Sequence, residues 1–221
     1  MLIQQILEAE QRTAASREIR SLMQSEGYRL LGSGADATVW TKRSATGVIK
    51  IIMPDAGQGS STAKYFEKFY DFCRAHPEFE NLPRFSELKK FVINDVEYTA
   101  AAMEKLRPVK SGSFAEAMVW VLSDLATTGQ SWRQVQSQIQ QPQTWQHYSG
   151  TLSAQDIVDQ FVNLSPNQKS QWSLLYGLMQ ILYQTGNINR LGWDLHTENV
   201  MQRSDGTLVI VDPWFNIESQ Q

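Results

Sequence analysis

The stretch GWDLHTENVMQRSDGTLVIVDPWF, residues 192–215, decides how this chain of 221 residues is interpreted. Asp194 and Asn199 lie five residues apart in a loop after a long apolar helix. Asp212 follows thirteen residues after Asn199, at the end of the strand-like LVIV. The intervening turn Ser204-Asp205-Gly206 predicts a hairpin, which folds Asp212 back beside Asn199.

These three side chains suit a magnesium site. Magnesium is usually held by one or two protein oxygen ligands, while substrate phosphates and water complete its shell. Asn199 and Asp212 can provide two such ligands, and Asp194 beside them could accept or orient the proton of an attacking hydroxyl. The structural alternative is that the aspartates cap turns and Asn199 satisfies backbone groups. A second aspartate behind a strand favours the functional interpretation.

Two glycines mark the tip of a predicted hairpin in LLGSGADATVW, residues 30–40. Because Gly32 and Gly34 lack a Cβ, the backbone there can come close to a ligand, and exposed amides could cover phosphate oxygens. Paired glycines in a tight turn are more often simple turn residues, so this feature alone is weak evidence.

Lys50 lies in GVIKII, a strand that is otherwise fit for burial. Burying an unpaired ammonium group costs several kcal/mol, so the pattern predicts a counter-charge. We favour Glu67, on a helix expected over 62–75, with Asp71 and Glu78 as alternatives. The structural alternative is an edge-strand lysine that reaches solvent.

The expected elements change in character along the chain. An amphipathic helix or two is expected within 2–25, three strands within 28–53, and a loop at 55–63 before the helix over 62–75. Further strands are expected at Phe85–Leu88, Phe91–Ile93 and Glu97–Met103, with a turn at Asn94-Asp95. Beyond a linker near 104–112, helices are expected over 113–127, 131–140, 153–164 and 167–185, then short strands at 199–202 and 207–211. The Gln-rich segment 130–146 fits either a surface helix or a mobile insertion.

Composition favours a cytoplasmic globular protein. The net charge of −3 and pI of about 5.7 provide no basic field for nucleic acid. No apolar run reaches the ~20 residues that cross a bilayer, and the N-terminus lacks a basic and apolar leader. Cys73 is the single cysteine, which excludes an internal disulfide, and we expect it as a core thiol. His76 and His147 have no partner at metal-ligand spacing, so no zinc site is expected.

Together these stretches resemble the protein-kinase-like superfamily. Residues 32–39 (GSGADATV) are similar to its loop G-x-G-x-x-G-x-V, with Ala37 in place of the third glycine. VIK at 48–50 resembles the V-A-I-K strand, and MEKL at 103–106 resembles the gatekeeper and hinge. WDLHTENV at 193–200 resembles the catalytic loop H-R-D-L-x-x-x-N, and DPW at 212–214 stands where D-F-G stands.

The resemblance implies an α+β, bilobal protein-kinase-like fold. Its N-lobe would be an antiparallel β-sheet with one helix, and its C-lobe would be reduced and mainly helical. The expected divisions are an N-terminal helical extension at 1–26, an N-lobe at 27–106 and a truncated C-lobe at 107–221.

The resemblance also implies phosphoryl transfer from ATP with Mg²⁺, in which catalysis is mostly positioning and charge neutralisation. Lys50 would hold the α and β phosphates, braced by Glu67. Asn199 and Asp212 would bind the metal, and Asp194 would receive or orient the acceptor hydroxyl. The implied catalytic residues are Asp194, Lys50 and Asn199, and the implied nucleotide-binding set is Gly32, Gly34, Val39, Lys50, Glu67, Met103, Glu104 and Leu106.

Several positions depart from the family pattern. His196 replaces the lysine of serine/threonine kinases and is more like aminoglycoside and choline-type phosphotransferases. Trp193 stands where an arginine often partners a phosphorylated activation loop. Pro213 and Trp214 replace Phe-Gly, which is expected to stiffen the segment. Nothing corresponds to the A-P-E motif, and the chain ends where a peptide-docking platform would begin.

Three functions follow as expectations. The first is an active kinase acting on serine or threonine of a protein, such as a host protein, as the resemblance to short kinases of tailed bacteriophages implies. The second is a small-molecule phosphotransferase. Such enzymes usually have an acidic substrate pocket, and the few carboxylates of 113–185 count against this function. The third is a catalytically idle kinase-fold module that binds a partner protein. The sequence does not fix the acceptor, the oligomeric state or regulation by autophosphorylation.

Overall fold

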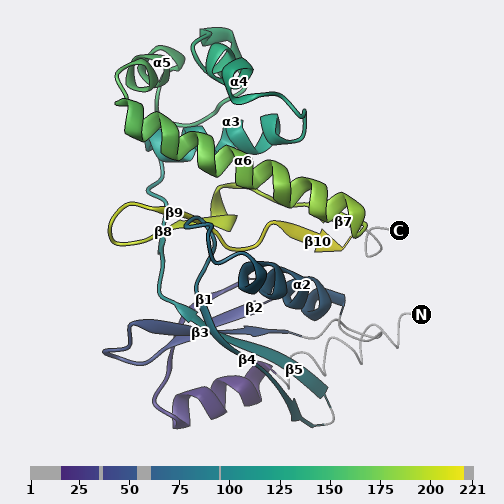
Figure 1. Ribbon diagram of the computed structural model, residues 1–221. Helices are drawn as coiled ribbons and strands as arrows, with labels where there is room; N and C mark the ends of the chain where they lie inside the picture. The colour runs from purple at the N-terminus through teal and green to yellow at the C-terminus, as the bar shows by residue number, and fades with distance from the viewer. Residues whose placement is uncertain (1–15, 35–36, 54–60, 95, 217–221) are drawn as a thin grey trace, which may run out of the picture. The chain divides into compact units, whose positions relative to one another are not determined.

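The computed structural model describes residues 16–34, 37–53, 61–94 and 96–216 of an α+β protein. The chain divides into two compact units (Figure 1). The first comprises Met1–Pro77 and Pro83–Lys105, and the second comprises Glu78–Leu82 and Leu106–Gln221. The division after Lys105 lies one residue from the expected boundary, whereas the inclusion of residues 78–82 in the second unit was not expected.

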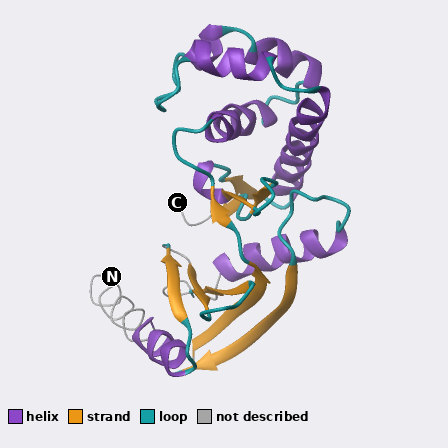
Figure 2. Cartoon of the chain, turned by 90° about the vertical axis from the view of Figure 1, so that its left-hand side faces the viewer, coloured by secondary structure: helices purple, strands orange, loops and turns teal. Residues whose placement is uncertain are grey.

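The first unit contains a five-stranded antiparallel sheet with the strand order β1-β2-β3-β5-β4 (Figure 2, orange). The strands are β1 (Arg29–Ser33), β2 (Ala37–Thr41), β3 (Gly47–Ile52), β4 (Phe85–Ile93) and β5 (Val96–Glu104). The three strands expected within 28–53 are confirmed. The expectation of two separate strands at Phe85–Leu88 and Phe91–Ile93 was wrong, because Lys89 and Lys90 continue an edge strand whose side chains reach solvent.

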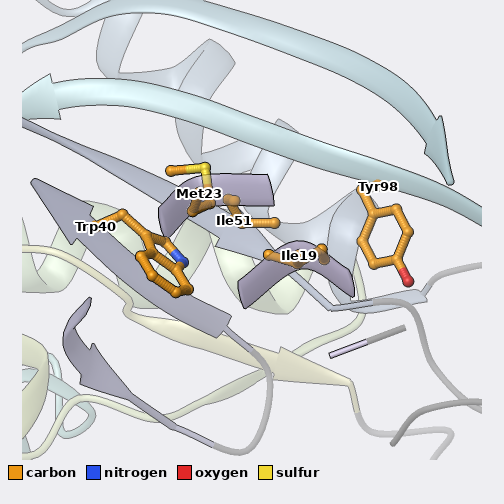
Figure 3. Packing of buried hydrophobic residues seen from close by; sticks show 5 residues of the cluster. All are labelled: Ile19, Met23, Trp40, Ile51 and Tyr98. Atoms are coloured by element: carbon orange, nitrogen blue, oxygen red, sulfur yellow. The ribbon is translucent and has the colours of Figure 1, made fainter. Parts of the chain in front are cut away.

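Apolar side chains cover both faces of this sheet. On one face, Ile19 and Met23 of a helix over 16–25 pack with Trp40, Ile51 and Tyr98 (Figure 3). The remainder of the helix expected within 2–25 lies outside the described residues. On the other face, Phe66 of α2 (Ser61–Ala75) packs with Ile52 and Ala101. The alternation of Ile51 and Ile52 toward opposite faces is the two-residue period of a strand.

Helix α2 also carries the single cysteine. Cys73 is buried, and burial raises the pKa of its thiol above the ordinary range. A thiol held in its neutral form is a poor nucleophile. The expectation of a core cysteine is confirmed.

The second unit is mainly helical. Its elements are α3 (Phe114–Ala126), α4 (Trp132–Ile139), the 3-10 helix η1 (Pro142–Trp145), α5 (Ala154–Val162) and α6 (Pro166–Ile188). The four helices match the expected ranges to within a few residues. The Gln-rich segment forms α4 and η1, and it is fixed to the unit by its buried apolar residues Val135, Ile139 and Trp145.

Two small sheets complete the second unit. One pairs β7 (Leu191–Trp193) with β10 (Trp214–Asn216), and the other has the order β6 (Arg107–Pro108), β8 (Val200–Gln202) and β9 (Leu208–Ile210). The β8–β9 hairpin was expected, whereas β6, β7 and β10 were not. No helix among the described residues is long and apolar enough to span a bilayer.

Segment 78–82 is bound to the sheet of β8 and β9 through backbone groups. Asn81 accepts from the backbone N–H of Ile210 at 2.9 Å through its own carbonyl, and its side-chain amide donates to the Leu208 carbonyl at 2.8 Å. The Arg203 guanidinium donates to the carbonyls of Glu80 and Leu82. These contacts explain why the segment belongs to the second unit although it lies between α2 and β4 in the chain.

Candidate active site

The β8–β9 hairpin brings the two ends of the opening motif together. Val200 pairs with Ile210, and one residue further out the Val211 N–H donates to the Asn199 carbonyl at 2.9 Å. Asp212 follows Val211 directly, so it lies beside Asn199 as the hairpin prediction requires. The turn that closes the hairpin is built from Asp205, which accepts from the Thr207 N–H at 2.9 Å, and from Gly206, whose φ is 96°.

The second small sheet brings in Asp194. Trp193 pairs with Trp214 across β7 and β10, and the Asp194 N–H donates to the Pro213 carbonyl at 2.9 Å. Asp194 directly follows β7, and Asp212 lies two residues before β10. Both therefore lie at the same end of this sheet. The two strand pairings together place Asp194, Asn199 and Asp212 in one part of the second unit.

Two tryptophans fix this backbone to the helices. The Trp193 indole N–H donates to the Ser123 carbonyl at 3.3 Å, and the Trp214 indole N–H donates to the Leu182 carbonyl at 3.0 Å. Gly186 of α6 is required by this contact, because a Cβ there would lie 2.8 Å from the Trp214 indole nitrogen. Ser123 of α3 also donates its hydroxyl to the Leu195 carbonyl. Rigid elements therefore position the Asp194 loop from both sides.

The amide of Asn199 is oriented by its nitrogen. Nδ2 donates to the Asp194 carbonyl at 2.6 Å, lies 3.4 Å from the Asp194 carboxylate Oδ2 and lies 3.1 Å from His196 Nε2. A carbonyl oxygen only accepts, so it selects the nitrogen end of the amide. Oδ1 makes no hydrogen bond with the part of the chain that the structure describes. It is therefore the atom that can bind a cation.

The carboxylate of Asp194 is partly withdrawn from solvent. Burial raises its pKa above the ordinary value, opposed by a positive charge on His196 and reinforced by the negative charge of Asp212. Its Oδ1 lies 3.9 Å from His196 Nε2, while His196 Nδ1 accepts from the Glu198 N–H at 3.3 Å. A raised pKa makes this carboxylate a better proton acceptor than an exposed one.

In the first unit, the predicted nucleotide-binding residues form one row across the sheet. Gly32 pairs with Val39, Val39 pairs with Lys50, and Lys50 pairs with Ala101. Residues directly opposite in neighbouring strands point to the same face of a sheet. Lys50 is 9% exposed, and its ammonium group lies 4.9 Å from the centre of the Phe66 ring. An aromatic face attracts a cation at this distance.

The structure of the chain itself does not require the first glycine of this row. A Cβ built on Gly32 meets nothing within 4 Å, and Gly32 is not among the glycines with positive φ. The Gly34 N–H donates to the Ala37 carbonyl at 2.9 Å, which closes the tip of the β1–β2 loop across residues 35–36, outside the described ranges. Close approach of a ligand to the backbone would explain the glycine at position 32.

Glu67 has partners that the sequence did not suggest. Its Oε1 lies 2.8 Å from Lys90 Nζ and accepts from the Thr99 hydroxyl at 3.2 Å, and the contact with Glu67 raises the pKa of Lys90. Thr99 pairs with Ile52, two residues along β3 from Lys50. Residues two apart in a strand point to the same face of the sheet, so the contact of Glu67 with Thr99 lies on the same face as Lys50. The bracing of Lys50 by Glu67 stays a prediction.

The remaining predicted residues lie at the end of β5 and just beyond it. Met103 is buried, and Glu104 is held by Arg84, whose N–H donates to the Glu104 carboxylate at 2.8 Å and whose carbonyl accepts from the Glu104 N–H at 3.0 Å. Leu106 is half-buried and begins the main part of the second unit. The Glu104 N–H is already used by this bond to Arg84, so a nucleotide base would have to use other backbone groups of this segment.

Asn199 and Asp212 would be a small ligand set for a metal ion. Within the described ranges, no group of three or more His, Cys, Asp and Glu side chains could hold a metal ion. No protein-family model matches the chain, and no curated protein matches it significantly in sequence. The function is therefore inferred from the geometry of the two units and from the spacing of the motifs.

Proposed function

We propose that this chain is an ATP- and Mg²⁺-dependent phosphotransferase with a bilobal, protein-kinase-like fold, and that it transfers the γ-phosphate to serine or threonine of a protein. One observation carries the proposal: two independent strand pairings bring Asp194, Asn199 and Asp212 together. Structural turn-capping alone does not need an acid, an amide and a second acid in one place.

The second unit would supply the metal and the proton acceptor. Asn199 Oδ1 and the Asp212 carboxylate are hard oxygen ligands of the kind that Mg²⁺ takes, with phosphate oxygens and water as the rest of its shell. Bound Mg²⁺ would neutralise charge on the phosphates. Asp194, with its pKa raised by burial, would orient the acceptor hydroxyl and receive its proton.

The first unit would supply the contacts to the nucleotide. Lys50 presents an ammonium group from a buried strand position, where a phosphate would gain more from the charge than it would in bulk water. Gly32 allows the backbone to approach the phosphates, and Val39 offers an apolar surface in the same row. Met103, Glu104 and Leu106 would border the adenine.

A small-molecule acceptor is the second candidate, and His196 favours it. Its Nε2 lies near both the Asp194 carboxylate and the Asn199 amide. By the resemblance of the motif, this polar ring would stand where serine/threonine kinases carry a lysine. Binding without catalysis is the third candidate, and it would use the same nucleotide contacts.

Incubation of the purified protein with γ-labelled ATP, Mg²⁺ and a cell lysate separates these functions. Labelled protein bands that disappear with Asp194→Ala support the protein kinase. ATP consumption without labelled protein supports the small-molecule enzyme. Nucleotide binding without turnover supports the binding module. Asp205→Asn is the matched control, because it changes an acid in the hairpin turn outside the proposed metal site.

A further inference from the structure

His196 lies in the candidate site and has no part in the transfer proposed above. Its backbone is fixed within the loop, because its N–H donates to the Asp194 carbonyl at 3.1 Å and its carbonyl accepts from the Asn199 N–H at 3.0 Å. Its ring caps the 3-10 helix η2 (Thr197–Asn199), where Nδ1 accepts from the Glu198 N–H at 3.3 Å. The ring is therefore held through Nδ1, and Nε2 faces other groups of the site.

The contact with Glu198 determines which ring nitrogen carries the proton. A backbone N–H can only donate, so His196 Nδ1 must present a lone pair to it. A neutral imidazole has one protonated nitrogen, and in this ring the proton is then on Nε2. His196 therefore offers an N–H donor at Nε2.

Two side chains lie near this donor, and one of them can accept. Asn199 Nδ2 is 3.1 Å from His196 Nε2, but it is itself a donor, because its bond of 2.6 Å to the Asp194 carbonyl fixes the nitrogen end of the amide. Two N–H donors cannot bond to each other. The Asp194 carboxylate can accept, and its Oδ1 lies 3.9 Å from His196 Nε2.

The same carboxylate faces both donors. Asp194 Oδ2 lies 3.4 Å from Asn199 Nδ2, while Oδ1 lies 3.9 Å from His196 Nε2. Nε2 and Oδ1 must come about 1 Å closer to form a hydrogen bond. The His196 and Asp194 side chains are 50% and 45% exposed, so both have room to move. The movement would also separate Nε2 from the competing donor of Asn199.

We propose that His196 is a positioning residue, whose Nε2–H donates to Asp194 Oδ1 and orients the carboxylate that receives the acceptor proton. This role rests on the proposed function, because only phosphoryl transfer uses Asp194 in this way. In that step the acceptor oxygen bonds to the γ-phosphorus, its proton passes to the Asp194 carboxylate and ADP leaves. His196 exchanges no proton. A carboxylate held by one donor at each oxygen cannot rotate without losing both bonds.

Asparagine and glutamine at position 196 separate this role from capping. Asparagine is a good cap whose oxygen can replace Nδ1 beside Glu198, but its side chain is too short to reach the position of Nε2. His196→Asn should keep the midpoint of thermal unfolding and lower kcat by about tenfold or more. The KM for ATP should not change, because the Asp194 carbonyl still holds the Asn199 amide. His196→Gln brings an amide N–H to the position of Nε2, so kcat should stay within about threefold of the wild type.

The rate at which γ-labelled ATP labels the proteins of a cell lysate, measured against the ATP concentration, gives kcat and KM. His147→Asn is the matched control, since His147 is an exposed histidine after η1 that contacts Gln146; it should match the wild type. Undiminished kcat in His196→Asn would show that the ring only caps η2 and would overturn the inference. A lower kcat in His196→Gln than in His196→Asn would also overturn it.

Nitrogen NMR of the isotope-labelled protein tests the same bond without any activity. The chain has three histidines, so the His196 signals are those that disappear in His196→Gln. At a pH of about 8, where an ordinary histidine is neutral, we expect the Nε2–H tautomer. Asp194→Ala should shift the Nε2 signal more than the Nδ1 signal, and Asp205→Asn should shift neither.

The two experiments fail in different ways. The Nδ1–H tautomer, or an Nε2 signal that does not respond to Asp194→Ala, overturns the role of His196 even if the lysate proteins are labelled. If no protein is labelled while Nε2 responds to Asp194→Ala, the bond to Asp194 stands and the proposed function fails.

Discussion

The side-chain nitrogen of Asn199 donates to the backbone carbonyl of Asp194 across 2.6 Å, and this bond fixes which end of the amide faces outward. The nitrogen is committed to the Asp194 loop, so the oxygen is the end of the amide that is left for a ligand, while the backbone of Asn199 is bonded to Val211, the residue before Asp212. The Asn199 side chain can therefore donate from Nδ2 to the Asp194 carbonyl and at the same time offer Oδ1 to a ligand. An aspartate could fill only the second role.

We expect Asn199→Asp to be harmful although aspartate is the stronger magnesium ligand. The change places a carboxylate oxygen against the Asp194 carbonyl, which should cost about 1–3 kcal/mol of unfolding free energy. ATP turnover should fall by about tenfold or more, because the proposed metal ligand is displaced. Chemical denaturation and a coupled ATP assay measure the two effects. Asp205→Asn keeps an acceptor for the Thr207 N–H and lies outside the proposed metal site, so it should keep the turnover of the wild type.

Lys50→Met should abolish phosphoryl transfer while the protein stays folded. Methionine keeps the length of the apolar stem near Phe66 and removes the ammonium charge that would hold the phosphates. We expect a loss of at least about 100-fold in turnover with an unfolding midpoint no lower than that of the wild type. Lys89→Met changes an exposed lysine of β4 and is the control. Wild-type turnover in Lys50→Met would contradict the role assigned to this residue.

Asp194→Asn should abolish the proposed phosphoryl transfer and stabilise the metal-free protein at neutral pH. Burial and Asp212 raise the pKa of Asp194 in the folded state, so ionisation of this carboxyl is harder there than in the unfolded chain. This difference in pKa therefore lowers the free energy of unfolding of the wild type as the pH rises from the ordinary carboxyl pKa through the raised one. The asparagine variant escapes this loss. Thermal unfolding between pH 3 and 8, as an approximate range, should show the two proteins converging in acid; equal midpoints throughout would refute the electrostatic cause.

Ser153→Ala should weaken α5. The Ser153 hydroxyl accepts from the Asp156 N–H at 3.2 Å, and the Asp156 carboxylate accepts from the Ser153 hydroxyl and N–H. Removal of such a cap costs about 1 kcal/mol. The same contacts with Ser153 lower the pKa of Asp156. They therefore stabilise the fold fully at pH values above the ordinary carboxyl pKa, and this stabilisation is lost as the pH falls through the lowered pKa. The cost of Ser153→Ala should shrink in acid, whereas Ser204→Ala, in the hairpin turn, should cost little at any pH.

Local signals account for the elements that the sequence predicted. The helices from Phe114 to Ile188 bury apolar residues at helical spacing, and three begin after a serine whose hydroxyl caps the first turn: Ser113, Ser153 and Ser165. The β8–β9 hairpin is fixed by its turn at Asp205 and Gly206. In each case the deciding contacts lie within a few residues in sequence.

The strands that the sequence missed depend on distant partners. β6, β7 and β10 have only two or three residues each, too few for a period, and β7 and β6 pair with segments far along the chain. The position of segment 78–82 likewise depends on backbone contacts to Arg203 and Ile210. Composition carries no signal for such contacts.

The candidate site divides in the same way. The spacing of Asp194, Asn199 and Asp212 predicted that they meet, because a hairpin and its turn are local features. The contact of Glu67 with Lys90 could not be predicted, since it depends on the register of β4 against β5. The anchoring of Trp214 on Leu182 also needed the fold, because the tryptophan gives no sign of which carbonyl it will meet.

Calorimetric titration of ATP into the protein, with and without Mg²⁺, tests most directly whether Asn199 and Asp212 hold a cation. We predict that Mg²⁺ tightens ATP binding by about tenfold or more in the wild type, that Asp212→Asn loses this gain, and that Lys50→Met binds ATP more weakly with or without the metal. ATP binding that is indifferent to Mg²⁺, or an Asp212→Asn protein with an undiminished response to Mg²⁺, would contradict the proposed metal site.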